Sequence, residues 1–414
     1  MQLLYNTGIR LYHFTIRLAA LFNPKARQFV MGRKNWKKKL ASKIDKDSPY
    51  IWFHCASLGE FEQGRPVMDA IKKQFPGIKI LLTFFSPSGY EIRKNYVNAD
   101  VVIYLPMDTR KNARDFLQLV RPQKVFFVKY EFWPNFIVEL NRQNIPLYCI
   151  SAIFREKQLF FKNNFMGKKY RGILRRFDHL FVQDKSSCQL LKSAGINNCT
   201  VSGDTRFDRV AAIAAGSKTI PFVEKFKGNS KLIIAGSTWK PDEELLAAFV
   251  NNSADIKMII APHETTPANI NKLEQLLKKP SIRYSKIKKT EVGNFQVLII
   301  DSVGLLSSLY RYGDIAYIGG GFGVGIHNTL EAATFGLPVI FGPEYKKFKE
   351  AVELVSKKGA FPIRNSTELN MILNKLLNDG EQLNESASAS KNYVKNNTGS
   401  TEIIIKKVFN NTYN

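Results

Sequence analysis

From about residue 50 onward, the chain alternates short apolar runs with amphipathic helical segments. This alternation is typical of α/β units with parallel strands. A first series of strands is expected at residues 50–54, 78–84, 100–104, 124–128, 146–150, 179–182 and 199–202. A second series is expected at residues 231–236, 257–261, 296–300, 314–318 and 338–341. A less patterned stretch separates the two series, so the sequence predicts two doubly wound, Rossmann-like α/β domains.

The 414 residues are enough for two domains that each bury a core of their own. The pattern divides them into a basic N-terminal segment (1–44), an N-terminal Rossmann-like domain (45–210), a linker (211–229), a C-terminal Rossmann-like domain (230–384) and a C-terminal segment (385–414). In that last segment we expect one helix, near 385–409, that packs back toward the first domain. Because ligands bind beyond the carboxyl ends of strands in open parallel sheets, the residues directly after strands are the candidate site residues.

The N-terminal segment contains ten Lys or Arg in residues 1–44 and no acidic residue before Asp45. Within 3–22, polar side chains recur at helical spacing and form one stripe: Asn6, Arg10, His13 and Arg17. Apolar side chains face away from it: Leu4, Leu11, Leu18 and Phe22. Two arginines would be costly inside hydrocarbon and would interrupt the apolar region of a signal peptide. A helix lying in the membrane interface therefore fits better, and a helix packed on its own domain is the alternative.

A basic run follows this helix and surrounds Phe29, Met31 and Trp36: Lys25, Arg27, Arg33, Lys34, Lys37, Lys38 and Lys39. Each basic residue near an anionic leaflet contributes roughly 1 kcal/mol to binding. We therefore expect this arm to hold the protein on an anionic membrane surface.

The charge and the cysteine and histidine content indicate which kinds of partner and site the chain can have. The net charge of +26 favours acidic lipid, nucleic acid or a phosphorylated substrate. Four cysteines form no CxxC pair and lie in or beside apolar runs, where buried free thiols are expected: Cys55, Cys149, Cys188 and Cys199. The five histidines form no HExxH motif and no cluster with cysteine. We therefore expect no metal site and no cofactor.

Two acidic side chains follow strands of the first series. Glu60 ends the motif HCASLGE (54–60), where Ser57 and Glu60 have the spacing of a capping box. Glu131 begins the motif EFWPN (131–135), which also has the features of a helix start, with proline in the first turn. Each carboxylate is therefore either a helix cap or start, or a general base at a strand end.

The second series has its own strand-end motifs. AGSTW (235–239) places Ser237 and Thr238 before a helix, where hydroxyls suit either a phosphate or a cap. The segment GGGFGVGIHNTLE (319–331) follows a strand and precedes a helix, so its glycines allow a ligand to approach the backbone closely. It matches neither the dinucleotide fingerprint nor the P-loop.

These motifs, in this order, resemble the Kdo (3-deoxy-D-manno-octulosonic acid) transferase family over about residues 50–350. The points of similarity are HCASLGE (54–60), EFWPN (131–135), SGDTRFD (202–208), AGSTW (235–239), GGG…HNTLE (319–331) and PVIFGPEYKKF (338–348). The resemblance implies a GT-B fold, two Rossmann-like domains with a cleft between them. It also implies an inverting transfer of Kdo from CMP-Kdo to the tetra-acylated lipid A precursor in lipopolysaccharide synthesis. The enzyme would lie at the cytoplasmic face of the inner membrane, peripherally or through an N-terminal anchor.

By match of motif, the resemblance implies roles for individual residues. Glu60 would be the general base and Glu131 a second acid at the acceptor site. Candidates for acceptor or anion binding are Ser57, Gly59, Arg155 and Arg206. Residues expected to contact CMP-Kdo are Ser237, Thr238, Pro262, His263, Gly304, Leu305, Leu306, Gly319, Gly320, Asn328, Thr329, Leu330 and Glu331. Among these, Glu331 would accept hydrogen bonds from the ribose hydroxyls.

Three positions depart from the family pattern. Lys129 stands where a second glutamate is common, Pro262-His263 replaces an Arg-His pair, and residues 151–155 read SAIFR instead of the expected Asn-x-Arg-x-Ser. Two alternatives stay open: another GT-B transferase that uses a UDP-sugar and a lipid-linked acceptor, and a basic nucleic-acid-binding protein. The second leaves the glycine-rich segment unused, and no RRM, KH or helix-turn-helix signature is found, so no nucleic-acid partner is expected.

Overall fold

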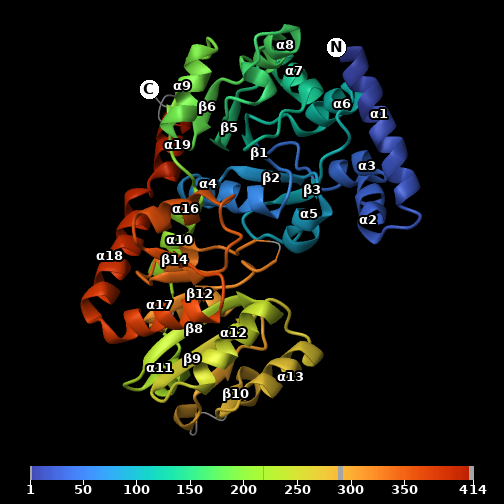
Figure 1. Ribbon diagram of the computed structural model, residues 1–414. Coiled ribbons are helices and arrows are strands. Elements are labelled where there is room, and N and C mark those ends of the chain that lie inside the picture. The colour runs from blue at the N-terminus through green and yellow to red at the C-terminus, as the bar shows by residue number, and fades with distance from the viewer. Residues whose placement is uncertain (1, 218, 288–291, 324, 410–414) are drawn as a thin grey trace. The chain divides into compact units, whose positions relative to one another are not determined.

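The computed structural model describes residues 2–217, 219–287, 292–323 and 325–409. The chain forms two compact units (Figure 1). The first contains Met1–Arg209 and Gly399–Asn414, and the second contains Val210–Thr398.

The first unit is built on a seven-stranded parallel sheet with the order β3-β2-β1-β4-β5-β6-β7. Its strands are β1 (Tyr50–Cys55), β2 (Lys79–Phe84), β3 (Val101–Tyr104), β4 (Lys124–Val128), β5 (Leu147–Ala152), β6 (His179–Val182) and β7 (Cys199–Val201). Its helices are α1 (Gln2–Ala19), α2 (Pro24–Arg33), α3 (Trp36–Ala41), α4 (Leu58–Gln74), α5 (Pro87–Arg93), α6 (Arg110–Val120), α7 (Pro134–Arg142), α8 (Phe165–Leu174), α9 (Lys185–Ser193) and α19 (Ser400–Phe409). A short 3-10 turn, η1, spans Leu159–Phe161.

Both faces of this sheet are buried, as the apolar strands require. Along β1, Tyr50 and Trp52 enter one core with residues of α6 and α7, and Ile51 and Phe53 enter the other with residues of α4 and α19. Helix α19 thus completes the second of these cores, and Phe409 stacks on Phe75 at 4.8 Å between ring centres.

The second unit repeats the design with the parallel order β10-β11-β9-β8-β12-β13-β14. Its strands are β8 (Lys231–Thr238), β9 (Ile256–Pro262), β10 (Ser281–Arg283), β11 (Val297–Ile299), β12 (Ile315–Ile318), β13 (Val339–Phe341) and β14 (Ala360–Pro362). Its helices are α11 (Pro221–Lys227), α12 (Lys240–Asn251), α13 (Pro267–Leu276), α14 (Leu306–Leu309), α15 (Leu330–Ala333), α16 (Lys349–Ser356), α17 (Ser366–Asn378) and α18 (Gly380–Asn396). Helix α10 (Arg206–Ala215) contains the point at which the chain passes from one unit to the next.

Each sheet has a switch point at which the strand order changes direction, between β1 and β4 in the first unit and between β8 and β12 in the second. Doubly wound sheets bind ligands at the carboxyl ends of the strands on either side of such a switch point. The residues after these strands are the ones that the sequence singles out.

The doubly wound α/β fold class is confirmed, and every expected strand is present, with ends shifted by one or two residues. The short strands β10 and β14 were not expected. The single helix expected near 385–409 is wrong: α18 and α19 are separate, and Gly399 between them has a φ of 105°. The stretch 211–229 also contains α11, whose Val223 and Phe226 are fully buried.

Helices α1 to α3 belong to the first unit. No helix in the described part of the chain has the length and hydropathy needed to span a membrane. On α1, Leu11, Phe14 and Leu18 are exposed, and Leu21 and Phe22, which follow the helix, are exposed as well. The side chain of Leu4 lies outside the described residues.

The expectation that Arg33 contributes to a basic surface is wrong, because its side chain is buried. Its guanidinium donates to the carbonyls of Leu105 (2.8 Å) and Phe85 (2.6 Å) and lies over the Phe29 ring. Burial lowers the pKa of Arg33 to about 9. This arginine therefore ties α2 to the ends of β2 and β3 and does not face a membrane.

Candidate functional site

At the first switch point, His54 at the end of β1 contacts Glu131 just after β4. His54 Nε2 lies 3.1 Å from Glu131 Oε2, and Trp133 Nε1 donates to the same carboxylate oxygen at 2.7 Å. The imidazole is fully buried and Glu131 is almost so. Within the motif EFWPN, Trp133 thus holds Glu131 at the strand end.

His54 is hydrogen-bonded through both of its ring nitrogens. Thr83 Oγ1 accepts from Trp52 Nε1 at 2.8 Å and lies 2.9 Å from His54 Nδ1. Trp133 Nε1 lies within hydrogen-bond distance of both His54 Nε2 (3.0 Å) and Glu131 Oε2. His54, Glu131 and Trp133 therefore form one polar cluster at this strand end.

Glu60 lies in the first turn of α4, and its Oε2 accepts the backbone N–H of Ser57 at 3.1 Å and the Ser57 hydroxyl. This is the capping box that the spacing predicts. Glu60 is half-buried beside the same strand end as Glu131: burial, and then the charges of Glu60 and Glu131, raise the pKa of the Cys55 thiol. The two carboxylates therefore lie around one switch point. Gly59, in the same turn, is exposed to solvent.

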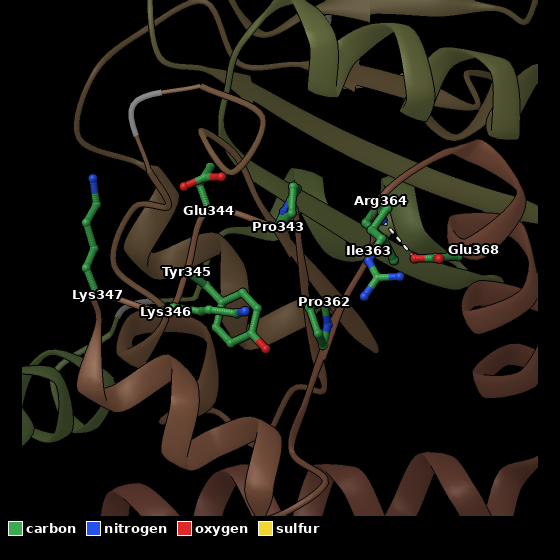
Figure 2. Close-up of a pocket in the computed structure, with 9 residues that line it drawn as sticks. All are labelled: Pro343, Glu344, Tyr345, Lys346, Lys347, Pro362, Ile363, Arg364 and Glu368. Carbon is green, nitrogen blue, oxygen red and sulfur yellow. Dashed lines mark hydrogen bonds between the residues drawn. The ribbon is translucent and has the colours of Figure 1, made fainter.

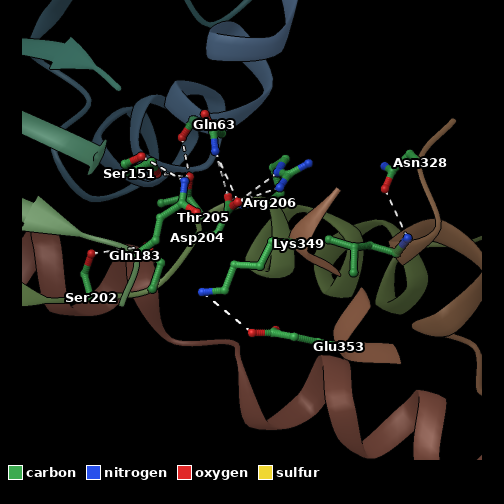
Figure 3. Close-up of polar contacts among 12 residues, drawn as sticks. Gln63, Ser151, Gln183, Ser202, Asp204, Thr205, Arg206, Asn328, Lys349 and Glu353 are labelled. Carbon is green, nitrogen blue, oxygen red and sulfur yellow. Dashed lines mark hydrogen bonds and ion pairs between the residues drawn. The ribbon is translucent and has the colours of Figure 1, made fainter. Parts of the chain in front are cut away.

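Arg155 and Arg206, the two candidate anion-binding arginines of this unit, differ in their surroundings. Arg155 is exposed, and its charge opposes the rise that burial causes in the pKa of Tyr130, the residue next to Glu131. Arg206 is held by Asp204, with Nε and Nη2 at 2.9 and 2.8 Å from Oδ2 (Figure 3). Burial would raise the pKa of Asp204, but Arg206 and Gln63 hold it below its ordinary value.

The Asp204 contacts belong to a buried polar network that joins α4 to the ends of β5 and β7. Gln63 Nε2 donates to both oxygens of Asp204 at 3.1 Å, Thr205 donates to the Gln63 carbonyl, and Ser151 Oγ lies 3.0 Å from Thr205 Oγ1. Ser151 and Lys129 have φ values of 54° and 69°, a strained conformation for residues other than glycine. Such strain is concentrated at functional sites.

In the second unit, the glycine-rich segment packs directly against the end of β8. A Cβ on Gly319 would lie 2.3 Å from the Ser237 carbonyl oxygen, so only glycine fits. The N–H groups of Gly320 and Trp239 both donate to Asp242 Oδ2 at 2.9 Å. Asp242 is buried, and burial raises its pKa. This carboxylate thus binds together the two segments that follow β8 and β12. Residue 324, within the glycine-rich segment, lies outside the described part.

Three rings stack at this edge. His263 lies between Trp239 and His327, with ring centres 4.6 Å apart on each side. Trp239 Nε1 donates to His327 Nε2 at 3.2 Å, and the backbone N–H of His263 donates to the Thr238 carbonyl at 2.9 Å. Burial, and then His263, lower the pKa of His327. The ring stack therefore places the imidazoles of His263 and His327 beside the glycine-rich segment.

The remaining expected donor contacts lie at the same edge. Asn328 Nδ2 donates to Glu331 Oε1 at 3.1 Å. Asn328 Oδ1, drawn in Figure 3, accepts the Leu330 N–H at 3.1 Å. Thr329 is buried. Leu306, after the turn at Gly304 and Leu305, packs over Gly236, as does the Tyr310 hydroxyl. Burial, and then Glu331, raise the pKa of Tyr310. Pro262 ends β9 beside Thr238.

A cavity of about 620 Å³ lies at the ends of β13 and β14 (Figure 2). Tyr345, Lys346 and Lys347 line it after β13, and Arg364 with Glu368 lines it after β14. A Cβ on Gly325 would lie 2.9 Å from Lys347 Nζ, so this ammonium lies against the glycine-rich segment. A smaller cavity, of about 160 Å³, is bordered by Trp239, Asp242 and Gly320.

Sequence reasoning missed several residues of these two edges. His54 and His327 lie inside recognised motifs, where their position beside a strand end was a usable signal. Trp239 follows β8 directly, and Asp242 has capping-box spacing from it. No group of three His, Cys, Asp or Glu side chains among the described residues is placed to hold a metal ion. The arrangement offers carboxylates at one strand edge and a glycine-rich segment, imidazoles and cations at the other.

Comparison with known proteins gives the family. A family model described as 3-deoxy-D-manno-octulosonic-acid transferase (kdotransferase) matches residues 34–209. The 3-deoxy-D-manno-octulosonic acid transferase of Aquifex aeolicus (strain VF5) is 30% identical over 335 residues, 79% of this chain and 86% of that protein. The Haemophilus influenzae protein of the same name is 24% identical over 367 residues, 86% of this chain and 85% of that protein.

Among solved structures, UDP-GlcNAc 2-epimerase from Neisseria meningitidis bound to UDP-GlcNAc has a TM-score of 0.61 at 16% sequence identity, covering 87% of this chain and 100% of that chain. This likeness concerns the fold alone and agrees with the GT-B class. The identity to the Aquifex protein over most of both chains gives the relationship: this chain belongs to the Kdo transferase family of glycosyltransferases.

Proposed function

We propose that this Kdo transferase takes Kdo from CMP-Kdo, attaches it to a tetra-acylated lipid A precursor and works on the cytoplasmic face of the inner membrane. The observation that carries the proposal is the pair of carboxylates, Glu60 and Glu131, around the first switch point. A transfer to a sugar hydroxyl needs a base at the place where the acceptor binds. The second switch point has the neutral and cationic groups that suit a nucleotide phosphate.

In the proposed reaction, Glu60 takes the proton of the acceptor hydroxyl as its oxygen bonds to the anomeric carbon of Kdo. The bond from that carbon to the CMP phosphate oxygen breaks, and CMP leaves with the electron pair. Attack opposite the leaving group inverts the anomeric carbon. Glu60 is released from Ser57 for this step, since its Oε2 otherwise accepts two hydrogen bonds from that residue.

Glu131 supports the acceptor in this proposal, and its contacts with His54 and Trp133 keep the carboxylate at the strand end. Ser57, Gly59, Arg155 and Arg206 remain the proposed acceptor or anion contacts. Arg206 is the least available of them because Asp204 holds its guanidinium.

The donor is proposed to bind at the second switch point. The glycine-rich segment and the hydroxyls of Ser237 and Thr238 would face the phosphate, and Glu331 the ribose. Pro262, His263, Gly304, Leu305, Leu306, Gly319, Gly320, Asn328, Thr329 and Leu330 complete the proposed contacts. Lys347 adds a cation next to the same segment, which suits a donor that carries both a phosphate and a carboxylate.

The test is incubation of the purified chain with a source of CMP-Kdo and the lipid A precursor, followed by mass spectrometry of the lipid. The expected product is the precursor with added Kdo. Parallel reactions contain UDP-sugars in place of CMP-Kdo. Transfer from a UDP-sugar, with none from CMP-Kdo, would refute the proposed donor, and RNA binding without any transfer would favour a different class of protein.

A further inference from the structure

Three large apolar side chains are exposed together at one end of the first unit, away from α1 in sequence. Leu159 is 44% exposed, Phe165 67% and Met166 40%. They lie on η1 and the first turn of α8, and we call residues 159–166 the α8 tip. Single exposed apolar residues are common, but a cluster of them marks an interaction surface.

The α8 tip is held in place by specific contacts. Arg171 Nη1 donates to the carbonyls of Phe160 (2.8 Å) and Lys162 (3.1 Å), and Asn164 Oδ1 accepts the Gly167 N–H at 2.8 Å. A Cβ on Gly167 would lie 2.0 Å from the Lys162 carbonyl oxygen, so the turn requires glycine here. The exposure of Phe165 and Met166 is therefore built into the fold.

Beneath the tip, an aromatic cluster anchors it to the unit. Phe160 contacts Phe132 and Phe154, with ring centres 5.2 and 6.0 Å apart, and Phe161 also packs on Phe154. Phe160 and Phe161 thus pack toward the unit, and Leu159, Phe165 and Met166 are left outside.

The charge around the tip has one sign. Between residues 155 and 176 the basic residues are Arg155, Lys157, Lys162, Lys168, Lys169, Arg171, Arg175 and Arg176, and the acidic residue is Glu156. Lys162 and Lys168 are exposed, and Lys169 Nζ lies 4.3 Å from the centre of the Phe165 ring. Apolar side chains ringed by cations complement a bilayer with anionic headgroups.

We infer that the α8 tip is a second membrane contact, in which Phe165 and Met166 enter an anionic bilayer and Lys162, Lys168 and Lys169 meet its headgroups. The inference rests on the membrane attachment in the proposed function and assigns part of it to a segment far from α1 in sequence. Tyr170 of α8 lies near enough to Tyr5 of α1 to contribute to the rise in the pKa of Tyr5, which burial chiefly causes. The α8 tip and α1 thus belong to the same unit.

The test uses the full chain and vesicles of phosphatidylcholine, with or without phosphatidylglycerol. A Phe165→Cys protein labelled with an environment-sensitive fluorophore should shift to the blue with anionic vesicles. A label at Val97→Cys, also in the first unit and 89% exposed, is the matched control and should not shift. The unsubstituted chain gives the background, since Cys199 is partly exposed. The double variant Phe165→Ser/Met166→Ser should bind these vesicles roughly tenfold more weakly.

A label at residue 165 that stays in water on anionic vesicles, or unchanged vesicle binding by the double variant, would overturn the inference. A blue shift without vesicles that grows with protein concentration would also overturn it and assign the tip to a second copy of the chain. Transfer of Kdo to a detergent-dispersed acceptor is measured in parallel. Absence of transfer in the unsubstituted protein refutes the proposed function, whereas the vesicle result decides the α8 tip alone.

Discussion

The hydroxyl of Tyr5 in α1 donates a 2.7 Å hydrogen bond to Asp108 Oδ2. The same buried carboxylate accepts the backbone N–H groups of Asn135 and Phe136 at 3.1 and 3.0 Å, at the start of α7. Asn135 also donates to the side-chain oxygen of Asn6 at 2.9 Å. Helix α1 is therefore fastened to the end of the motif that contains Glu131.

This arrangement predicts a pH dependence of stability. Burial raises the pKa of Asp108 to about 6, above its ordinary value near 4. Between these values the folded chain retains a proton that the unfolded chain has lost. Asp108 thus stabilises the folded chain by roughly 3 kcal/mol below about pH 4. This contribution to the free energy of unfolding is lost as the pH rises through about 6. Asp108→Asn should remove this dependence, measured as the free energy of urea unfolding across that range.

The control for this experiment is Asp47→Asn, which changes an exposed carboxylate. It should leave the slope of stability against pH unchanged. A slope in Asp108→Asn equal to that of the unsubstituted protein would show that Asp108 is not the group that titrates.

Glu60→Gln should reduce transfer by roughly 10²–10⁴-fold, because a positioned base is worth about that much. Glutamine can also fill the last position of a capping box, so the free energy of unfolding should change by less than about 0.5 kcal/mol. Rates and urea titrations on the same preparation measure both. A folded variant with more than about a tenth of the native rate would leave Glu60 the role of a helix cap only.

Glu331→Ala should weaken CMP binding by roughly 1.5–3 kcal/mol, because a carboxylate that accepts ribose hydroxyl protons is lost. Calorimetric titration with CMP measures the change, and binding of the lipid acceptor should stay the same. Glu381→Ala, an exposed position in the first turn of α18, is the matched control. Unchanged CMP affinity would place the nucleotide elsewhere.

Chelation should not affect transfer. In the proposed donor site, the glycine-rich segment and Lys347 would bind the phosphate without a metal ion. Rates measured with EDTA and with added Mg²⁺ should therefore agree. Activity that disappears with EDTA and returns only with Mg²⁺ would contradict the proposed phosphate site.

The strands were predictable because most are continuous apolar runs buried on both faces of a sheet. β10 and β14 were not: each has three residues and lies at an edge, and their sequences Ser281–Arg283 and Ala360–Pro362 include polar residues or proline. The break at Gly399 was missed because the sequence on both sides of it is helical.

For the site, sequence spacing located the strand-end segments but not the contacts between them. His54 and Glu131 meet because β1 and β4 are neighbours, and the ring stack of Trp239, His263 and His327 joins three separate strand ends. Such pairings depend on strand order. The burial of Arg33 could not be predicted either, because a run of basic residues is expected on the surface. Only the fold shows that aromatic rings surround this arginine.

Helix α1 has Leu11, Phe14 and Leu18 on its exposed side, while Tyr5 and Asn6 fasten the helix to the unit. Because these three apolar side chains have little to pack against, changing all of them to serine should leave the fold intact. Vesicle binding should fall by tenfold or more, since each buried apolar side chain contributes about 1.5–3 kcal/mol. Co-sedimentation with phosphatidylglycerol vesicles measures the loss.

A charge-reversal variant tests the electrostatic part of vesicle binding separately from the apolar part. Lys38→Glu/Lys39→Glu avoids Lys37, which pairs with Asp115. At low salt this variant should also bind more weakly, because it loses attraction to the anionic surface. At high salt, where charges are screened within about 3 Å, it should approach the unsubstituted protein. The serine variant should remain weaker at every salt concentration, because apolar burial does not depend on charge. Vesicle binding by the serine variant equal to that of the unsubstituted protein would mean that α1 does not enter the bilayer.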